Sequence, residues 1–143
     1  MTIPNSVTAI GYEAFSRCSS LKSITIPNSV TAIGDSAFFV CRSLVNIAIP
    51  ASVTAIGDEA FAGCISLTSI TVDPGNRQYI SVNGILFSKD GTSILCYPPG
   101  NGFTSYTIPA GVTAIGEGAF SGCSSLSSAD REAIRRRFGN GVF

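Results

Sequence analysis

The chain has 143 residues, 45% of them hydrophobic and 13% charged, and its nine basic and nine acidic side chains leave no net charge. A neutral chain lacks the field that recruits nucleic acid or an anionic membrane surface. Histidine is absent, which removes the commonest general base and metal ligand. No apolar run is long enough to span a bilayer. The length suits one compact domain or one rod of repeats.

The sequence repeats a unit of 23 residues that reads roughly L-x-x-I-x-I-P-x-x-V-T-A-I-G-x-x-A-F-x-x-C-x-S. Its fixed positions recur in three consecutive copies, at Pro4, Pro27 and Pro50, and at Phe15, Phe38 and Phe61. A fourth copy, with Pro109 and Phe120, follows after 36 extra residues. A spacing held over four copies is typical of a part that stacks on copies of itself.

Each unit predicts the same local structure. In residues 21–27, apolar and polar side chains alternate, which indicates a short strand that Pro27 ends. In the following stretch Val30 and Ile33 point inward, and Gly34 permits a sharp turn. Asp35 is expected to cap a short helical turn. One such coil cannot bury its apolar side alone, so the pattern predicts a solenoid of coils about 4.7–4.9 Å apart.

The cysteines follow the same repeat. Four of the five share one position, namely Cys18, Cys41, Cys64 and Cys123. No close C-x-x-C pair suits zinc. Stacking in register puts neighbouring Cβ atoms about 4.8 Å apart, which exceeds the usual disulfide spacing. We therefore expect these four thiols to be reduced and buried as small apolar fillers, and Cys96 to be the most exposed.

Residues 71–106 break the period. Two apolar runs, 85–87 and 94–97, flank Lys89-Asp90-Gly91, which indicates a hairpin. One interpretation is an enlarged coil whose hairpin stacks on the core. The other is a projecting loop whose aromatic and basic side chains contact a protein partner. With the neighbouring strand positions, this second interpretation predicts the contact residues Ser69, Thr71, Arg77, Tyr79, Tyr97, Phe103 and Tyr106.

Residues 128–143 predict a helix, with Ala133, Ile134 and Phe138 on one face and Gly139 as its stop. The triplet 135–137 is all arginine, but one triplet on a neutral chain is too little for nucleic-acid binding. We expect the helix to cap the last coil. No comparable cap precedes Thr2, so the first coil is expected to be bare. A bare strand edge favours self-association there, or indicates that repeats upstream are missing.

The register "IP…V…IG…AF…C" resembles the BspA-type leucine-rich repeats, a 23-residue class found in surface proteins of bacteria and some protists. The match covers residues 2–70 and 107–127. The fold expected for residues 1–143 is a single repeat solenoid, a leucine-rich-repeat-like stack of short parallel strands and short helical turns. A β-hairpin insertion (71–106) and a C-terminal helix cap (128–143) complete it. The resemblance implies display at the cell surface or outside the cell.

No catalytic, cofactor-binding or metal site is predicted, since no histidine is present to activate a serine or cysteine nucleophile. The leading hypothesis is a non-catalytic module that binds a protein ligand, with adhesion to matrix proteins or other cells implied by the resemblance. No nucleic-acid partner and no membrane insertion is expected. The alternative is a structural spacer, or a fragment of a longer repeat array, with no ligand of its own. Exposed aromatic residues over 79–106 would favour binding, and buried ones the spacer.

Overall fold

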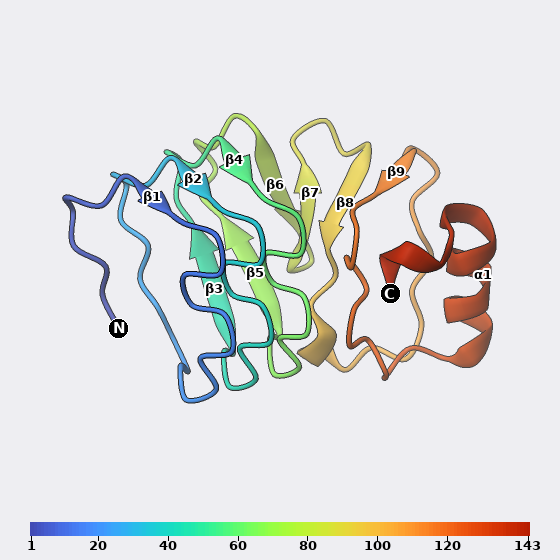
Figure 1. Cartoon of the computed structure of the whole chain (residues 1–143). Helices are drawn as coiled ribbons and strands as arrows, with labels where there is room; N and C mark the ends of the chain where they lie inside the picture. The colour runs from blue at the N-terminus through green and yellow to red at the C-terminus, as the bar shows by residue number, and fades with distance from the viewer.

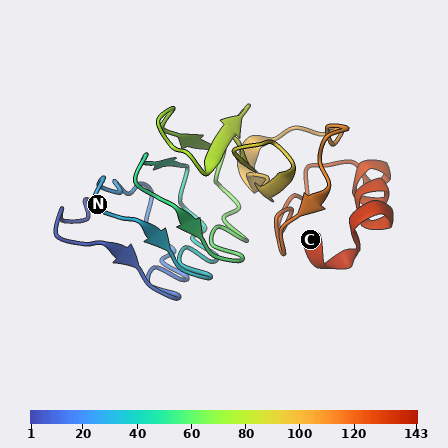
Figure 2. The ribbon, with the colours of Figure 1, turned by 90° about the horizontal axis from the view of Figure 1, so that it is seen from above.

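The computed structural model describes all 143 residues, and it shows coils stacked into a rod with the two chain ends at opposite ends (Figure 1). One parallel sheet contains β1 (Ala9–Ile10), β2 (Ala32–Ile33) and β4 (Ala55–Ile56). Their register pairs Ala9 with Ala32 and Ala32 with Ala55. Each residue therefore lies beside the residue 23 positions later in the sequence, and successive coils are stacked along the rod (Figure 2).

A second row of strands contains β3 (Asn46–Ile49) and β5 (Ser69–Val72), which pair in parallel. In β3, Ile47 and Ile49 are buried while Asn46 and Ala48 are exposed, as the alternating pattern predicts. The two coils before β3 add only an isolated parallel bridge between Thr2 and Thr25 to this row. The prolines that end these stretches have no N–H group to continue the ladder.

The segments between the two strand rows are consecutive turns, so the expected short helical turns are wrong. Ser36 and Val40 adopt left-handed backbone conformations with φ of 55° and 57°, and alternating residues of these turns donate N–H groups to the next coil. Phe38 N–H, for example, donates to the Ala60 carbonyl at 2.8 Å. Asp35 caps no helix, because its Oδ1 accepts the Asp58 N–H of the next coil at 2.8 Å.

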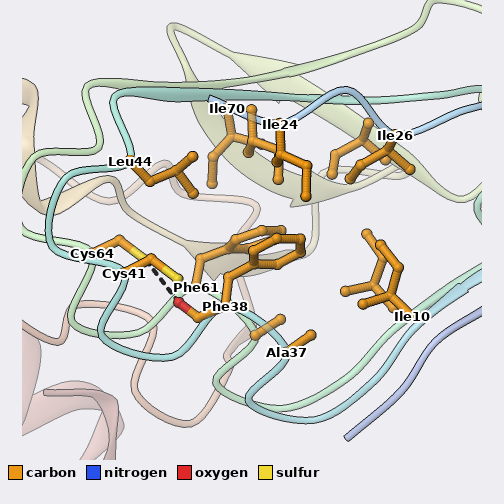
Figure 3. Close-up of a cluster of buried hydrophobic side chains, with 14 of the residues drawn as sticks. Ile10, Ile24, Ile26, Ala37, Phe38, Cys41, Leu44, Phe61, Cys64 and Ile70 are labelled. Atoms are coloured by element: carbon orange, nitrogen blue, oxygen red, sulfur yellow. Dashed lines mark hydrogen bonds between the residues drawn. The ribbon is translucent and has the colours of Figure 1, made fainter. Parts of the chain in front are cut away.

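The core of the first coils is a column of stacked rings. The centroids of Phe15 and Phe38 are 5.3 Å apart and those of Phe38 and Phe61 are 5.5 Å apart, with nearly parallel planes. Cysteine thiols run beside them, and the Cys64 Sγ donates to the Phe38 carbonyl at 3.0 Å (Figure 3). The Cys41 Sγ donates to the Phe15 carbonyl in the same way. Rings and thiols thus recur one per coil.

All five cysteines are free. Cys41, Cys64 and Cys123 are buried as predicted, whereas Cys18 in the first coil is only half-buried. The expected exposure of Cys96 is wrong, because β8 turns this side chain into the core, where it is 5% exposed. Burial raises the pKa of the Cys96 thiol to about 12.

The irregular segment forms two hairpins rather than one. β6 (Tyr79–Val82), β7 (Ile85–Ser88) and β8 (Ser93–Cys96) are antiparallel neighbours, and β8 continues in parallel to β9 (Ala114–Ile115). The expected β7–β8 hairpin is present. The β6–β7 hairpin turns at Asn83-Gly84, whose φ values of 53° and 80° suit a two-residue turn. A short 3₁₀ helix, η1 (Pro99–Asn101), follows β8.

The rod ends with helix α1 (Ser128–Phe138), which lies beside the last coil (Figure 1). The Ser127 hydroxyl caps it by accepting the Asp130 N–H at 3.2 Å, and Ile134 is its buried residue.

Each arginine of the triplet 135–137 contacts another group of the same chain. Arg136 pairs with Glu132 at 3.3 Å, Arg135 lies over the Phe143 ring, and Arg137 donates to the Val112 carbonyl. No helix of the chain has the length and apolarity needed to cross a bilayer.

After α1, the short 3₁₀ helix η2 (Asn140–Val142) occupies the position that the turns of a further coil would take. The N–H groups of Gly118 and Phe120 donate to the carbonyls of Gly141 and Val142 at 2.8 and 2.7 Å. Phe143 follows Phe120 by 23 residues, and their ring centroids are 5.7 Å apart. The sequence "GNGVF" therefore occupies the place of "GEGAF" in a coil whose remainder is replaced by the helix.

Candidate interaction surface

The structure removes Tyr97 from the predicted contact residues, because its side chain is only 1% exposed. Tyr97 precedes Phe120 by 23 residues and occupies the ring column of its coil, where the two rings stack at 5.0 Å. The Cys123 Sγ donates to the Tyr97 carbonyl at 3.4 Å. This repeats the thiol-to-carbonyl bond of the regular coils. Tyr97 is thus a core residue of an abbreviated repeat.

Tyr79 and Tyr106 are partly buried and engaged in the fold. The Tyr79 hydroxyl accepts the N–H of Ile56 at the edge of β4 at 2.9 Å, and burial raises the pKa of Tyr79. The side chain thus bridges β4 and the hairpin segment, where the two sheets do not pair. The Tyr106 ring lies 4.9 Å from that of Tyr97, and burial raises its pKa to about 12.

Ser69 lies under the Asn83-Gly84 turn. A Cβ on Gly84 would approach the Ser69 Cβ to 3.0 Å, and the Ile70 N–H donates to the Gly84 carbonyl at 2.9 Å. The β6–β7 hairpin therefore packs its turn against the edge of β5. This close contact requires a residue without a side chain at position 84, whose positive φ also suits glycine.

Three of the predicted contact residues remain exposed, namely Thr71, Arg77 and Phe103, the last at 53%. They do not form one patch. Phe103 lies two residues after η1, and η1 lies at the opposite edge of the rod from the β7–β8 turn (Figure 1). Thr71 lines a groove of about 420 Å³ with Asp73 and the prolines that end the strands.

Arg77 lines a second groove of about 430 Å³, together with Lys89. The sequence pattern predicts a turn at Lys89 and no role for this side chain in binding. The Asn83-Gly84 pair holds the signal that was missed, because a two-residue turn there pairs residue 78 with residue 89. The Lys89 N–H indeed donates to the Gln78 carbonyl at 2.8 Å. Two cations distant in sequence thereby line one groove.

No group of three or more His, Cys, Asp or Glu side chains is placed to hold a metal ion. The cavity lined by the acidic side chains Asp58, Glu59 and Glu117 lies between the third coil and the turn after β9, and it has a volume of only about 30 Å³. A space of this size holds about one water molecule.

Stacked parallel coils with an exposed, open surface define a repeat solenoid of the leucine-rich repeat type. The model of the BspA type leucine rich repeat region matches residues 1–94 and 96–143 in six copies. The chain belongs to this family. The six copies extend across the irregular segment, beyond the four regular units over residues 2–70 and 107–127.

Among solved structures, the chain is similar to a leucine rich cell surface protein from Faecalibacterium prausnitzii A2-165, with a TM-score of 0.80 and 37% identity. It is also similar to the pneumococcal vaccine antigen PcpA, with a TM-score of 0.68 and 25% identity. Each match covers 88% of this chain but only 33% and 43% of those proteins. The chain thus spans less than half of either relative. No curated protein sequence matches it significantly.

Proposed function

We propose that the chain is a non-catalytic protein-binding module displayed at the cell surface, where it contributes to adhesion to matrix proteins or other cells. The main support for this proposal is membership of the leucine-rich repeat family, since rods of this kind present long regular surfaces that suit extended protein partners. The similarity to a protein described as a cell surface protein supports the location. The irregular segment adds a groove lined by Arg77 and Lys89, whereas the groove on the regular coils carries no basic side chain.

The alternative function, a spacer without a ligand, is favoured by a different observation. Tyr97 is fully buried, and both Tyr79 and Tyr106 are partly covered. Aromatic residues that commonly dominate binding energy are therefore mostly used in packing. The outward positions of the strands, such as Asn46 and Ala48, are small. A surface of this kind yields little desolvation energy, so a module with this function would bind nothing tightly.

The two functions can be told apart by whether the chain binds any partner saturably. The whole chain, immobilised in one orientation, is titrated with purified matrix proteins and with extracts of bacterial surfaces. The binding function predicts at least one partner that saturates and that competes with free chain. The spacer function predicts none.

Point variants locate the contact better than a deletion, because removal of residues 75–103 would also remove Leu86, Ile94 and Tyr97 from the core. If the partner contacts the irregular segment, Phe103→Ala weakens binding by about tenfold, or roughly 1.4 kcal/mol. Val45→Ala is the matched control, because Val45 is an exposed apolar residue on a regular coil. Equal losses in the two variants would place the contact on the repeats.

A further inference from the structure

We propose that the groove between the loop before β6 and the β7–β8 turn binds the carboxylate side chains of an extended acidic segment in a protein partner. This inference rests on the proposed protein-binding function and names the chemistry of the partner. The groove has a volume of about 430 Å³ and is lined by Arg77, Gln78, Ser88, Lys89 and Asp90. Its lining is entirely polar or charged, which suits a charged side chain and not an apolar one.

Strand pairing fixes the two walls of this groove. Tyr79 pairs with Ser88 in the β6–β7 ladder, and the Lys89 N–H extends that ladder to the Gln78 carbonyl at 2.8 Å. Arg77 therefore lies one position beyond the pairing, across from the β7–β8 turn. Because the hairpin is anchored by buried Ile85 and Phe87, the groove is built on a rigid element.

The two bases of the groove are free of ion pairs. The only ion pairs of the chain join Arg135 and Arg136 to Glu132. Arg77 and Lys89 are both exposed, and neither side chain donates a hydrogen bond within the protein. Their donors therefore remain available to an outside acceptor.

The one carboxylate in the groove is committed to the turn. Asp90 Oδ1 accepts from the Thr92 N–H at 3.1 Å, and from the hydroxyls of Ser88 and Thr92, each at 2.8 Å. These bonds, led by the Thr92 N–H, lower the pKa of Asp90. Asp90 thus stays ionised and holds the turn, and the groove retains two positive charges against one negative.

A short acidic peptide fits this arrangement better than a polyanion. The guanidinium group binds a carboxylate through two parallel hydrogen bonds, and the ammonium group adds a point charge. In an extended peptide, side chains on one face recur about every 6.6–6.8 Å. Two acidic residues separated by one residue can therefore face the two bases, one on each wall of the groove. Nucleic acid and anionic membranes need a broader basic surface, whereas this chain has no net charge.

The test is an NMR titration of the whole chain with the blocked peptide Gly-Glu-Gly-Glu-Gly. The expected result is saturable shifts of the Gln78 and Lys89 amide signals, with none from Gly-Lys-Gly-Lys-Gly. The double variant R77Q/K89Q is expected to raise Kd at least about tenfold. R42Q is the matched control and should leave Kd within about twofold, because Arg42 is an exposed base on a regular coil. Unchanged amide spectra elsewhere show that the variants fold.

Three outcomes would overturn the proposal: no shifts at the groove, equal weakening by R42Q, or unchanged binding in R77Q/K89Q. A single-stranded oligonucleotide or a sulfated glycan that binds the groove more tightly than the peptide would also overturn it. Failure of the broader function is distinguishable. If a matrix protein captured by the whole chain binds R77Q/K89Q as tightly as the parent, the protein-binding function stands and the groove assignment falls.

Discussion

Tyr97 and Phe120 stack at 5.0 Å with an interplanar angle of 22°, although they belong to coils of very different length and shape. The contact shows that the column of stacked rings continues through the irregular segment, although the other positions of the repeat differ there. Phe143 then extends the same column beyond Phe120. In the sequence, the column is indicated by aromatic residues 23 positions before and 23 positions after Phe120.

Tyr97→Phe is expected to keep or increase stability, because the buried Tyr97 hydroxyl makes no hydrogen bond of good geometry, although the Asn101 side chain lies near it. Phenylalanine is also the residue at this position in the regular coils. Tyr97→Ala, by contrast, is expected to cost about 3–5 kcal/mol through the cavity it leaves. Urea unfolding of both variants measures the difference. Similar losses for the two would show that the hydroxyl, and not the ring, is what the core needs.

Thiol labelling of the native protein is expected to modify Cys18 first and alone, because it is the only half-buried thiol. Burial holds the pKa of Cys96 at about 12, so this thiol stays protonated and unreactive near neutral pH. Denatured protein should react at all five cysteines. Mass spectrometry of labelled peptides distinguishes the sites. Labelling of native Cys96 ahead of Cys18 would contradict the structure.

Stability is expected to fall in alkaline solution as the buried tyrosines ionise. Burial raises the pKa of Tyr106 to about 12, above the unfolded value of about 10. The folded state thus favours the protonated phenol. Its stabilising contribution is complete below about pH 10 and is lost as the pH rises through about 12. Urea midpoints measured across this range should decline less steeply for Tyr106→Phe, and an identical decline would exclude Tyr106 as a source.

Hydrogen exchange should locate the break in the ladder of turns. The Ser36 N–H donates to the Asp58 carbonyl of the next coil at 3.0 Å, whereas the equivalent N–H of Glu59 has no acceptor. After correction for sequence, Glu59 is expected to exchange at least about tenfold faster than Ser36. Equal protection would mean that a well-ordered water or the next coil satisfies the Glu59 amide.

The regular coils could be predicted from sequence because their apolar residues recur at a constant spacing of 23 residues. Each fixed apolar position has one inward place, and only a stack of copies buries it, as Phe38 and Phe61 show. The turns were mistaken for helices because Ser36 and Val40 adopt positive φ without being glycine. Nothing in local propensity indicates that conformation. It is stabilised by hydrogen bonds to the next coil, which become visible only once the coils are stacked.

The candidate site was harder to predict because aromatic residues serve packing and binding equally well. Tyr97 was assigned to the surface by its turn-rich surroundings, although its distance from Phe120 placed it in the core. The groove of Arg77 and Lys89 depended on a turn at Asn83-Gly84 that was not recognised. Both signals were present as spacings. Residue type alone, without register, could not separate buried from exposed side chains.

The replacement of the last coil by α1 and η2 gives the rod a direction. The N–H groups of Gly118 and Phe120 are already bonded to η2, so the row of turns has no free donor at these two positions. The opposite face, formed by the first coil, keeps its strand edge and an apolar hollow of about 280 Å³ lined by Ile10 and Phe15. A further coil stacked on the side of α1 would have to displace η2 from the row of turns. The row of turns can therefore be extended without loss of hydrogen bonds only on the side of the first coil.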